Sequence, residues 1–340
     1  MRPSAISHRA GTTPAPPPKA ASISVVMPVR NEARRIAKAL EAVLAQTLAP
    51  IEIIVVDGHS TDGTVEIAKR YGTRVFFEDD RTRAGACQVG VLAATGEFVA
   101  FTDADCLPEP EWLERLVAGF EDGVVGVGGR IVNQGETFWQ HTVDAALDTF
   151  VGSANSVQGR PFPERRHVTS ISGCNSMYRR SDLLAVGGFR RELVTTEDTE
   201  LNRRLLSRGT LLYVPDAVVQ HRHERGLKDF AKRMLQYGYG RGQSLLSGSP
   251  MVISVLAPLG LVLLIVRPSY GLLLVGFYGL VLLLSSIGPA VRRRRPALVL
   301  AIPWVLAIEH ACYALGFWKG LFLARGAFRR RAREDGRDSV

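Results

Sequence analysis

The sequence predicts an α/β fold whose sheet is mostly parallel, followed by C-terminal transmembrane helices. Within residues 23–102, short apolar runs alternate with segments of helical periodicity, as in βαβ units. Long, uncharged, apolar stretches then follow residue 250. A hydrophobic content of 46% and a slightly positive mean hydropathy are high for a purely soluble protein, so part of the chain is expected in lipid.

Each element of the α/β part follows from its own pattern. Short apolar runs predict four buried strands, at residues 23–28, 51–56, 74–77 and 98–102. Apolar residues at helical spacing predict the connecting helices, at residues 32–46, 64–71 and 84–94. After a less regular stretch, we expect a helix at 200–206 and strands at 211–214 and 218–219. The first strand–helix turn is not Gly-x-Gly-x-x-Gly, which disfavours a dinucleotide-dependent dehydrogenase.

The chain divides into five segments. Residues 1–21 are rich in Pro, Ala, Ser and Thr and lack an apolar core, which predicts a disordered tail rather than a signal peptide. The α/β domain is expected at residues 22–225. It is followed by an amphipathic interface helix with a linker, a hydrophobic membrane region of two to three helices, and a basic tail, at residues 226–249, 250–320 and 321–340.

The interface helix places Leu227, Phe230 and Met234 on one face and basic residues on the other. This pattern suits a helix lying in the membrane interface, although a surface helix packed on the protein core shows it too. Three apolar stretches follow, at residues 251–266, 269–291 and 297–317. Because the second is apolar all round, three buried helices of a soluble protein are disfavoured.

Charge predicts the topology. Two crossings return the arginines at 292–295 to the side of the α/β domain, as the positive-inside rule prefers. The third stretch either spans the bilayer or lies re-entrant or interfacial, since a third crossing puts the C-terminal arginines on the opposite side. We therefore expect a multi-pass protein of the inner (plasma) membrane, with its α/β domain facing the cytoplasm.

Composition also limits the partners. The formal net charge is +9, and the basic residues cluster beside apolar stretches, which favours anionic lipid. No zinc-finger spacing or recognition helix supports nucleic-acid binding. The four cysteines contain no Cys-x-x-Cys pair, which disfavours a metal cluster or a disulfide framework and favours a reducing compartment.

The motif Asp103-Ala104-Asp105 directly follows the fourth predicted strand. An open α/β sheet places its ligand crevice at the carboxyl ends of such strands. Carboxylate oxygens are hard ligands suited to Mg²⁺ or Mn²⁺, ions that commonly bridge protein carboxylates to phosphates. A solvated turn is the alternative interpretation of the motif.

Several motifs, in this order, resemble glycosyltransferase family 2. They are Pro28-Val29-Arg30-Asn31-Glu32, Val55-Val56-Asp57-Gly58-His59-Ser60-Thr61-Asp62-Gly63-Thr64, Asp103-Ala104-Asp105, Gly187-Gly188-Phe189, Thr196-Glu197-Asp198, Arg204-Leu205 and Val219-Gln220-His221. The resemblance covers roughly residues 23–241 and implies the GT-A fold of nucleotide-diphospho-sugar transferases. The sequence Tyr237-Gly238-Tyr239-Gly240-Arg241-Gly242, followed by apolar helices, resembles the membrane-anchored bacterial exopolysaccharide branch that includes succinoglycan glucosyltransferases.

The resemblance implies a nucleotide-sugar site with a divalent ion. Asp57 accepts the uracil imide N–H in this interpretation; capping of the following turn is the compatible alternative. Asp105 binds Mg²⁺ or Mn²⁺ directly, and His221 is either a further metal ligand or bonded to backbone. The residues implied to bind the nucleotide-sugar are Pro28, Arg30, Glu32, Asp57, Arg83 and Asp103; Arg83 is alternatively a solvated surface residue.

The same resemblance implies a general base on the acceptor side. Asp198 is the residue expected to deprotonate the attacking hydroxyl, which inverts the anomeric configuration. The alternative for Glu197-Asp198 is an acidic helix N-terminus. The residues expected to border the acceptor are Gly173, Asn175, Glu197 and Arg241.

Together these features predict an inverting, metal-dependent transferase. It moves a sugar from a nucleotide-diphosphate donor, UDP-linked by expectation, to a membrane-associated, lipid-linked saccharide. The Gln-x-x-Arg-Trp motif of processive relatives is missing after Gln236, so addition of a single sugar is expected. Two alternatives stay open: transfer to polyprenyl phosphate itself, and a catalytically inactive assembly module with the same fold. The Gly-rich N-terminal signature of sugar-phosphate nucleotidyltransferases is missing.

Overall fold

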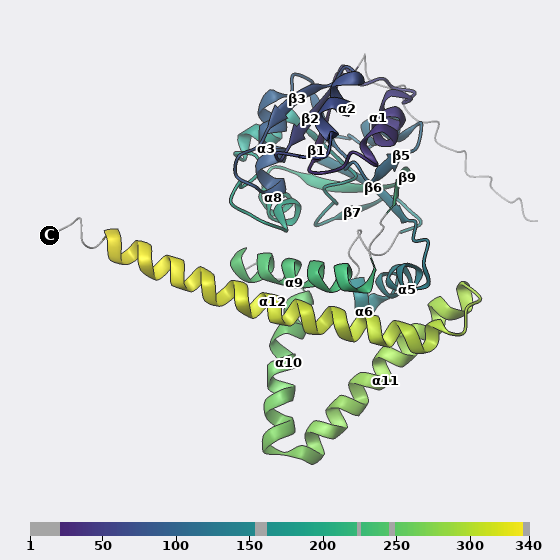
Figure 1. The fold of residues 1–340 in the computed structure, drawn as a ribbon, viewed down its shortest axis with the longest axis vertical. Helices are drawn as coiled ribbons and strands as arrows, with labels where there is room; N and C mark the ends of the chain where they lie inside the picture. The colour runs from purple at the N-terminus through teal and green to yellow at the C-terminus, as the bar shows by residue number, and fades with distance from the viewer. Residues whose placement is uncertain (1–20, 154–161, 223–225, 245–248, 336–340) are drawn as a thin grey trace, which may run out of the picture.

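The computed structural model describes residues 21–153, 162–222, 226–244 and 249–335. These residues form a nine-stranded mixed sheet in the order β3-β2-β1-β4-β8-β6-β9-β5, with β7 paired to β9 (Figure 1). The strands are β1 (Ile23–Val29), β2 (Glu52–Asp57), β3 (Arg74–Phe77), β4 (Phe98–Phe101), β5 (Cys106–Pro108), β6 (Val124–Asn133), β7 (Arg166–Val168), β8 (Ser176–Arg179) and β9 (Thr210–His221). The tail expected at residues 1–21 lies, except for Ala21, outside the described residues.

Helices connect and cover the sheet. Those of the α/β part are α1 (Ile36–Leu44), α2 (Thr64–Arg70), α3 (Arg83–Ala93), α4 (Trp112–Val117), α5 (Phe138–Leu147), α6 (Phe150–Ser153), α7 (Arg180–Ala185) and α8 (Glu197–Leu205). The C-terminal helices are α9 (Leu227–Ser244), α10 (Ser249–Val266), α11 (Pro268–Arg292) and α12 (Leu298–Asp335).

The first half of the sheet is parallel, as the alternating pattern predicts. Strand β1 pairs in parallel with β2 on one side and β4 on the other, and β3 extends the parallel set. Helices α1, α2 and α4 pack on one face, and α3, α7 and α8 on the other, so this part of the sheet lies between two apolar layers. The α/β prediction is therefore confirmed, whereas the sheet as a whole is mixed rather than mostly parallel.

Two boundaries differ from the sequence prediction. Helix α1 starts at Ile36 rather than Glu32, because Asn31 adopts φ = 55° and the Glu32 amide donates to Thr64 Oγ1. The two short strands predicted at 211–214 and 218–219 form one strand, β9. Its register against β6 shifts after Val214, because the inserted residues include Pro215, which has no N–H for the ladder.

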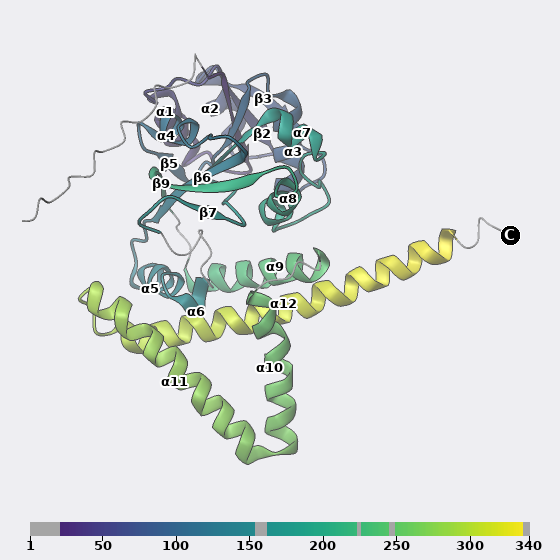
Figure 2. The same ribbon diagram turned by 180° about the vertical axis from the view of Figure 1, so that it is seen from behind.

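The second half of the sheet is mixed. Strand β8 runs antiparallel to both β4 and β6, and β9 carries antiparallel β5 and β7. The long chain segments between these strands place α5, α6 and α8 below the sheet, on the side of the C-terminal helices (Figures 1 and 2). This arrangement places residues from the middle of the chain opposite the C-terminal helices.

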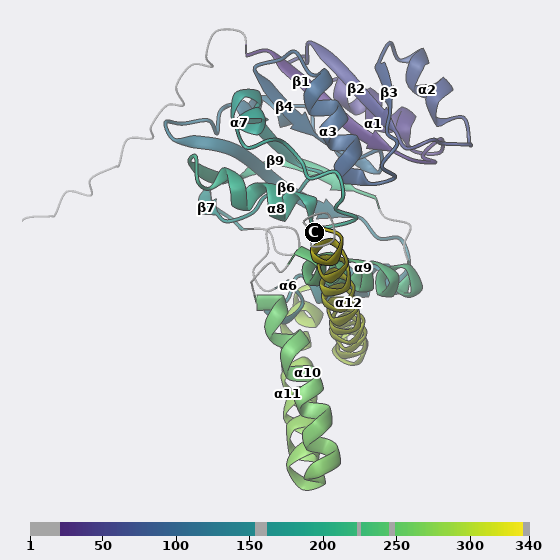
Figure 3. The same cartoon turned by 90° about the vertical axis from the view of Figure 1, so that its left-hand side faces the viewer.

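Helices α10 and α11 form a hairpin that projects away from the sheet, whereas α12 crosses alongside α9 (Figures 1 and 3). Among the described residues, α11 and the segment Leu298–Leu323 are long and apolar enough to cross a bilayer. Exposed apolar side chains cover α11, where Leu273 is 71% exposed. The hairpin therefore presents an apolar surface that suits lipid rather than water.

Helices α9 and α12 approach each other backbone to backbone. Both carry Gly-x-x-x-Gly, at Gly238–Gly242 and Gly316–Gly320, and a Cβ added at Gly238 meets Tyr313 O at 2.0 Å. Small residues at this spacing permit close helix packing in membranes. The apolar face of α9 predicted from the sequence includes Phe230, which packs against α5, α11 and α12 in the structure. Packing on protein, the alternative considered for this helix, is thus observed for that face.

Candidate active site

The carboxylates of Asp103 and Asp105 lie just beyond the carboxyl end of β4, next to the carboxyl end of β1. Strand order reverses direction at this point of the sheet, the usual place for a ligand crevice. Both residues line a cavity of about 510 Å³ that extends from the sheet to helices α5, α6, α9 and α12. The motif therefore opens into a cavity that reaches the C-terminal helices α9 and α12.

Arg83 links the motif to the first turn of α8. Its guanidinium donates to Asp103 Oδ1 and to Glu197 Oε1, both at 2.7 Å, and to Gly173 O at 3.1 Å. Burial raises the pKa of Glu197, although the positive charge of Arg83 acts in the opposite direction. Arg83 is therefore a paired residue that holds three segments together; the expectation of a solvated surface arginine is wrong.

Asp198 lies in the first turn of α8 and lines the cavity. Its Oδ2 accepts from the amide of Gly173 at 3.1 Å, and its Oδ1 accepts from the amide of Thr199 at 2.6 Å. The preceding Thr196 has φ = 63°, a costly conformation for a β-branched residue and one that clusters at functional sites. Fixed backbone donors therefore hold the Asp198 carboxylate in one orientation at the N-terminus of α8.

Asp105 and His221 meet at the other side of the motif. Asp105 is 7% exposed, and its Oδ2 lies 3.4 Å from His221 Nε2 and 3.9 Å from Arg35. His221 Nδ1 lies 2.9 Å from Asn133 Oδ1, an oxygen that only accepts, so Nδ1 donates to Asn133 and Nε2 lies toward Asp105. A carboxylate beside an imidazole held by an outer hydrogen bond is a fitting donor set for a divalent cation.

The turns after β1 and β2 interlock beside this motif. Asp57 is fully buried and accepts from the amide and hydroxyl of Ser60, so the turn-capping interpretation is confirmed. Asn31 bridges the same turns, donating to Ser60 Oγ and accepting from the Thr61 amide. The remaining residues predicted here lie at the same edge: Pro28 at the end of β1, Arg30 exposed, and Glu32 paired with Arg35 at 3.2 Å.

Of the residues expected on the acceptor side, Asn175 is placed differently. Its side chain is fully buried, donates to the carbonyls of Arg130 and Ala217, and accepts from Trp112 Nε1. It therefore anchors the bulged β6–β9 pair and does not border the cavity. Gly173 does line it, and a Cβ there meets the guanidinium of Arg83 at 2.7 Å, so only glycine fits.

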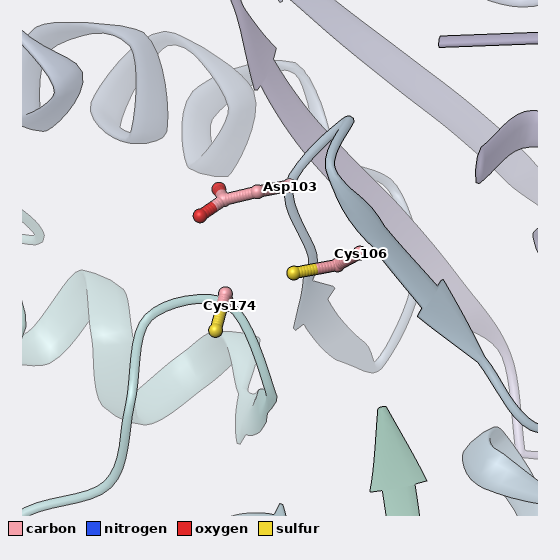
Figure 4. A group of neighbouring side chains, drawn as sticks. All are labelled: Asp103, Cys106 and Cys174. Atoms are coloured by element: carbon pink, nitrogen blue, oxygen red, sulfur yellow. The ribbon is translucent and has the colours of Figure 1, made fainter. Parts of the chain in front are cut away.

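Two cysteines that are far apart in the sequence meet beside Asp103 (Figure 4). Ligand atoms of Asp103, Cys106 and Cys174 all lie within 4.8 Å of one another. The scattered spacing in the sequence gives no sign of this proximity, which arises because the fold joins the two segments. A Cys-x-x-Cys pattern identifies only cysteines that are close in the sequence, whereas this pair is brought together by β5 and the loop before β8.

Sequence reasoning also missed residues on the helical side of the cavity. Arg241 lines it as predicted, and so do Arg233 of α9 and Glu309, His310 and Tyr313 of α12. Glu309 Oε2 is buried and has no hydrogen-bond partner among the described residues. A buried carboxylate oxygen without a hydrogen-bond donor is energetically costly.

Comparisons with known proteins agree with this geometry. Residues 24–187 match the Glycosyl transferase family 2 domain. The chain is 25% identical over 325 residues to a dolichyl N-acetyl-alpha-D-glucosaminyl phosphate 3-beta-D-2,3-diacetamido-2,3-dideoxy-beta-D-glucuronosyltransferase of Methanococcus voltae, covering 90% of this chain and 99% of that one. It is 27% identical to the succinoglycan biosynthesis protein ExoA of Rhizobium meliloti, over 90% and 96% of the two chains.

A solved structure shares the fold. The mannosyltransferase PcManGT of Pyrobaculum calidifontis, in complex with GDP-Man and Mn²⁺, superposes with a TM-score of 0.57 at 19% identity, covering 84% of this chain and 87% of that chain. At this identity the likeness concerns the fold alone.

Proposed function

Because this chain belongs to glycosyltransferase family 2 and is a glycosyltransferase, we propose that it transfers one sugar from a nucleotide-diphosphate donor to a membrane-associated, lipid-linked saccharide, with inversion. The observation that carries the proposal is the cavity, which joins Asp103, Asp105 and Asp198 to the apolar helices. A soluble donor enters at the sheet edge, while an acceptor held in the membrane reaches the cavity from the side that α9 and α12 line. The names of the two full-length relatives support an acceptor in lipid-linked or polysaccharide synthesis.

On the donor side, we assign the base and ribose to Pro28, Arg30, Glu32 and Asp57, with a uracil base. Asp57 keeps further lone pairs beyond those that Ser60 engages, because each carboxylate oxygen accepts two hydrogen bonds. Arg83 and Asp103 border the diphosphate, since both line the cavity. Asp105 and His221 would hold Mg²⁺ or Mn²⁺, which, when bound, neutralises charge on the leaving diphosphate.

On the acceptor side, Asp198 takes the proton of the attacking hydroxyl. The hydroxyl oxygen forms a bond to the anomeric carbon as the bond from that carbon to the diphosphate breaks, and the nucleoside diphosphate leaves with the electron pair. A single displacement of this kind inverts the anomeric centre. The amides of Gly173 and Thr199 orient the carboxylate, so it reaches the cavity in one fixed geometry.

Glu309 binds the acceptor in this proposal. Glu309 lines the cavity from α12 and its buried Oε2 has no partner among the described residues, so a sugar hydroxyl that reaches this oxygen supplies the missing donor. His310 is held beside it, because its Nδ1 lies 2.7 Å from Tyr278 Oη and its Nε2 lies 3.3 Å from Val151 O. A saccharide head group therefore fits this wall better than a purely apolar ligand.

The C-terminal helices keep the acceptor near the site. We propose that the α10–α11 hairpin enters the inner membrane, so that the α/β domain faces the cytoplasm. Arg293, at the end of the hairpin, is hydrogen-bonded to Asp148 and to His141 O between α5 and α6. This contact supports a return of the chain to the side of the α/β domain after two crossings, in keeping with the positive-inside rule. The greater burial of α12 supports an interfacial rather than a spanning position for it.

Transfer to polyprenyl phosphate itself is the second candidate. It is favoured by Arg233 and Arg241, which line the cavity on α9 and suit a phosphate. Both candidates share one test, the release of nucleoside diphosphate from a panel of nucleotide-sugars with Mn²⁺ or Mg²⁺. Bare polyprenyl phosphate and a lipid-linked saccharide extract serve as parallel acceptors; turnover with the extract alone supports the first candidate, and turnover with bare polyprenyl phosphate supports the second.

The Glu309→Gln variant tests the acceptor assignment separately. We expect KM for the lipid-linked saccharide to rise about 10-fold, because the amide replaces one of the two carboxyl oxygens with a donor, with KM for the donor unchanged. Glu111→Gln, an exposed residue before α4, serves as the control. An unchanged acceptor KM in Glu309→Gln overturns the assignment, and no turnover of any donor by the wild type contradicts the proposed function as a whole.

A further inference from the structure

Three potential ligands converge beside the Asp103-Ala104-Asp105 motif from three separate segments. Asp103 lies in the turn after β4, Cys106 begins β5, and Cys174 lies in the loop before β8 (Figure 4). The two thiol sulfurs and one carboxylate oxygen of Asp103 all lie within 4.8 Å of one another. Both cysteines are free and form no disulfide.

This donor set differs in kind from a site for Mg²⁺ or Mn²⁺. Those ions take oxygen ligands, whereas thiolates select softer ions such as Zn²⁺. Zinc binds sulfur at about 2.3 Å in a tetrahedron, so its ligand atoms lie nearly 4 Å apart. We propose that Cys106, Cys174 and Asp103 form a binding site for Zn²⁺, with the fourth position open to the cavity.

The surroundings of the three residues support such a site. Cys106 is fully buried, so one sulfur is already removed from water. Cys174 lines the cavity and gives an ion its route of entry. Ser172 Oγ lies 3.4 Å from Cys174 Sγ, the position of an outer hydrogen bond to a ligand sulfur. The buried hydrogen bonds of Asn175 fix the same loop, so only small movements are needed to close a tetrahedron.

Zinc at this site acts on the machinery of transfer. Asp103 is paired with Arg83, and Cys174 follows Gly173, whose amide donates to Asp198. An ion that draws Asp103 toward the two sulfurs weakens its pairing with Arg83, the residue that also contacts Gly173 O and Glu197. A site with oxygen, nitrogen or sulfur ligands generally binds Zn²⁺ more tightly than Mn²⁺. We therefore expect micromolar zinc to inhibit transfer even when Mn²⁺ is in excess.

The first experiment uses the wild-type, full-length protein in detergent with a non-thiol reductant. Zinc is added, excess is removed, and bound metal per chain is measured. Alkylation of cysteines is then mapped by mass spectrometry. We expect one Zn²⁺ per chain and at least 10-fold slower alkylation of Cys174, with Cys312 unaffected. Co²⁺ in place of zinc gives a thiolate-to-cobalt charge-transfer band.

The second experiment compares variants. Cys174→Ser and Cys106→Ser are expected to lose the zinc and the cobalt band, whereas Cys312→Ser, a change on α12, keeps both. Zinc bound equally by Cys174→Ser overturns the proposed ligand set, because Asp105, Cys106 and His221 also lie within 4.8 Å of one another and offer a different set. Unprotected Cys174 in the wild type, or a Cys106–Cys174 disulfide in place of bound zinc, overturns the site itself. None of these readouts depends on the donor or acceptor of the transferase.

Discussion

The cavity has two sides that are built in different ways. The sheet side consists of the turns after β1, β2 and β4, where short loops interlock through local contacts such as Asp57 with Ser60 and Asn31 with Thr61. The helical side consists of α5, α6, α9 and α12, which come from chain segments far apart in the sequence. Its helices are held by close glycine packing and by the contact of Arg293 with Asp148. Reactive groups thus lie on a rigid sheet edge, while the helices that reach the membrane supply the acceptor surface.

Asp198 lies where the two sides meet, and its loss is expected to have the largest effect. In Asp198→Asn, we expect kcat to fall by about 10³-fold, because general base catalysis contributes about 10² to 10⁴. The donor dissociation constant should stay unchanged, since the amide retains one acceptor oxygen for Gly173. Steady-state nucleoside diphosphate release and donor binding are the measurements.

The control for this variant is Asp122→Asn, an exposed residue in the turn before β6. It should match the wild type in both measurements. A wild-type kcat in Asp198→Asn contradicts the assignment of Asp198 as the general base. A loss of donor binding in this variant would instead show that Asp198 acts with the donor-binding residues of the sheet side.

The same contrast governs what the sequence could predict. Strands β1, β2 and β4 and their carboxylates follow from apolar periodicity and from motifs contained in a few consecutive residues. The prediction for Asn175 is wrong because a polar residue two positions after a glycine has the same pattern whether it borders a ligand or anchors a β-bulge. Cys174 and Glu309 become recognisable only when distant segments are brought together, which no local pattern encodes.

Arg83 connects the two sides, so its removal is expected to affect both stability and activity. Arg83→Met leaves Asp103 and the buried Glu197 without their cation, and we expect the free energy of unfolding to fall by about 3 kcal/mol. Unfolding in detergent, followed by circular dichroism, measures the change. Activity should fall in the same variant because Asp103 and the Gly173 loop lose a shared partner.

Arg115→Gln is the matched control, because Arg115 pairs with Glu111 on the exposed surface of α4. The free energy of unfolding of Arg115→Gln should fall by less than about 1 kcal/mol, as for surface pairs in general. Equal destabilisation by the two substitutions would show that Arg83 is no more than a surface ion pair.

The helical side can be disturbed alone through Gly238. In Gly238→Ala, the new Cβ meets the backbone of Tyr313, so α9 and α12 must separate. We expect a destabilisation of about 1–3 kcal/mol, the cost of overpacking, and a raised KM for the lipid acceptor with donor binding intact. Gly276→Ala on α11, where an added Cβ meets nothing within 4 Å, should leave both unchanged. A loss of donor binding in Gly238→Ala would mean that the two sides are not separable.

The smallest expected effect lies on the sheet side, at the end of the strands away from the cavity. Glu52 accepts from Ser24 Oγ, from the Thr95 amide and hydroxyl, and from Arg74. Although burial acts in the opposite direction, these donors lower the pKa of Glu52 from 4.5 to about 2. As the pH falls, Glu52 therefore takes up its proton in the unfolded chain before it does so in the folded protein. The stability that Glu52 contributes is complete above pH 4.5 and is lost as the pH falls toward about 2.

Glu52→Gln should accordingly lower the unfolding temperature slightly at pH 7 and reduce the dependence of that temperature on pH below 4.5. Thermal unfolding in detergent at several pH values measures both. Donor and acceptor KM should be unchanged at pH 7, because Glu52 is at the opposite end of β2 from Asp57. An acid dependence as steep as that of the wild type would mean that these hydrogen bonds add no stability to the sheet side, and that its rigidity comes from the apolar layers alone.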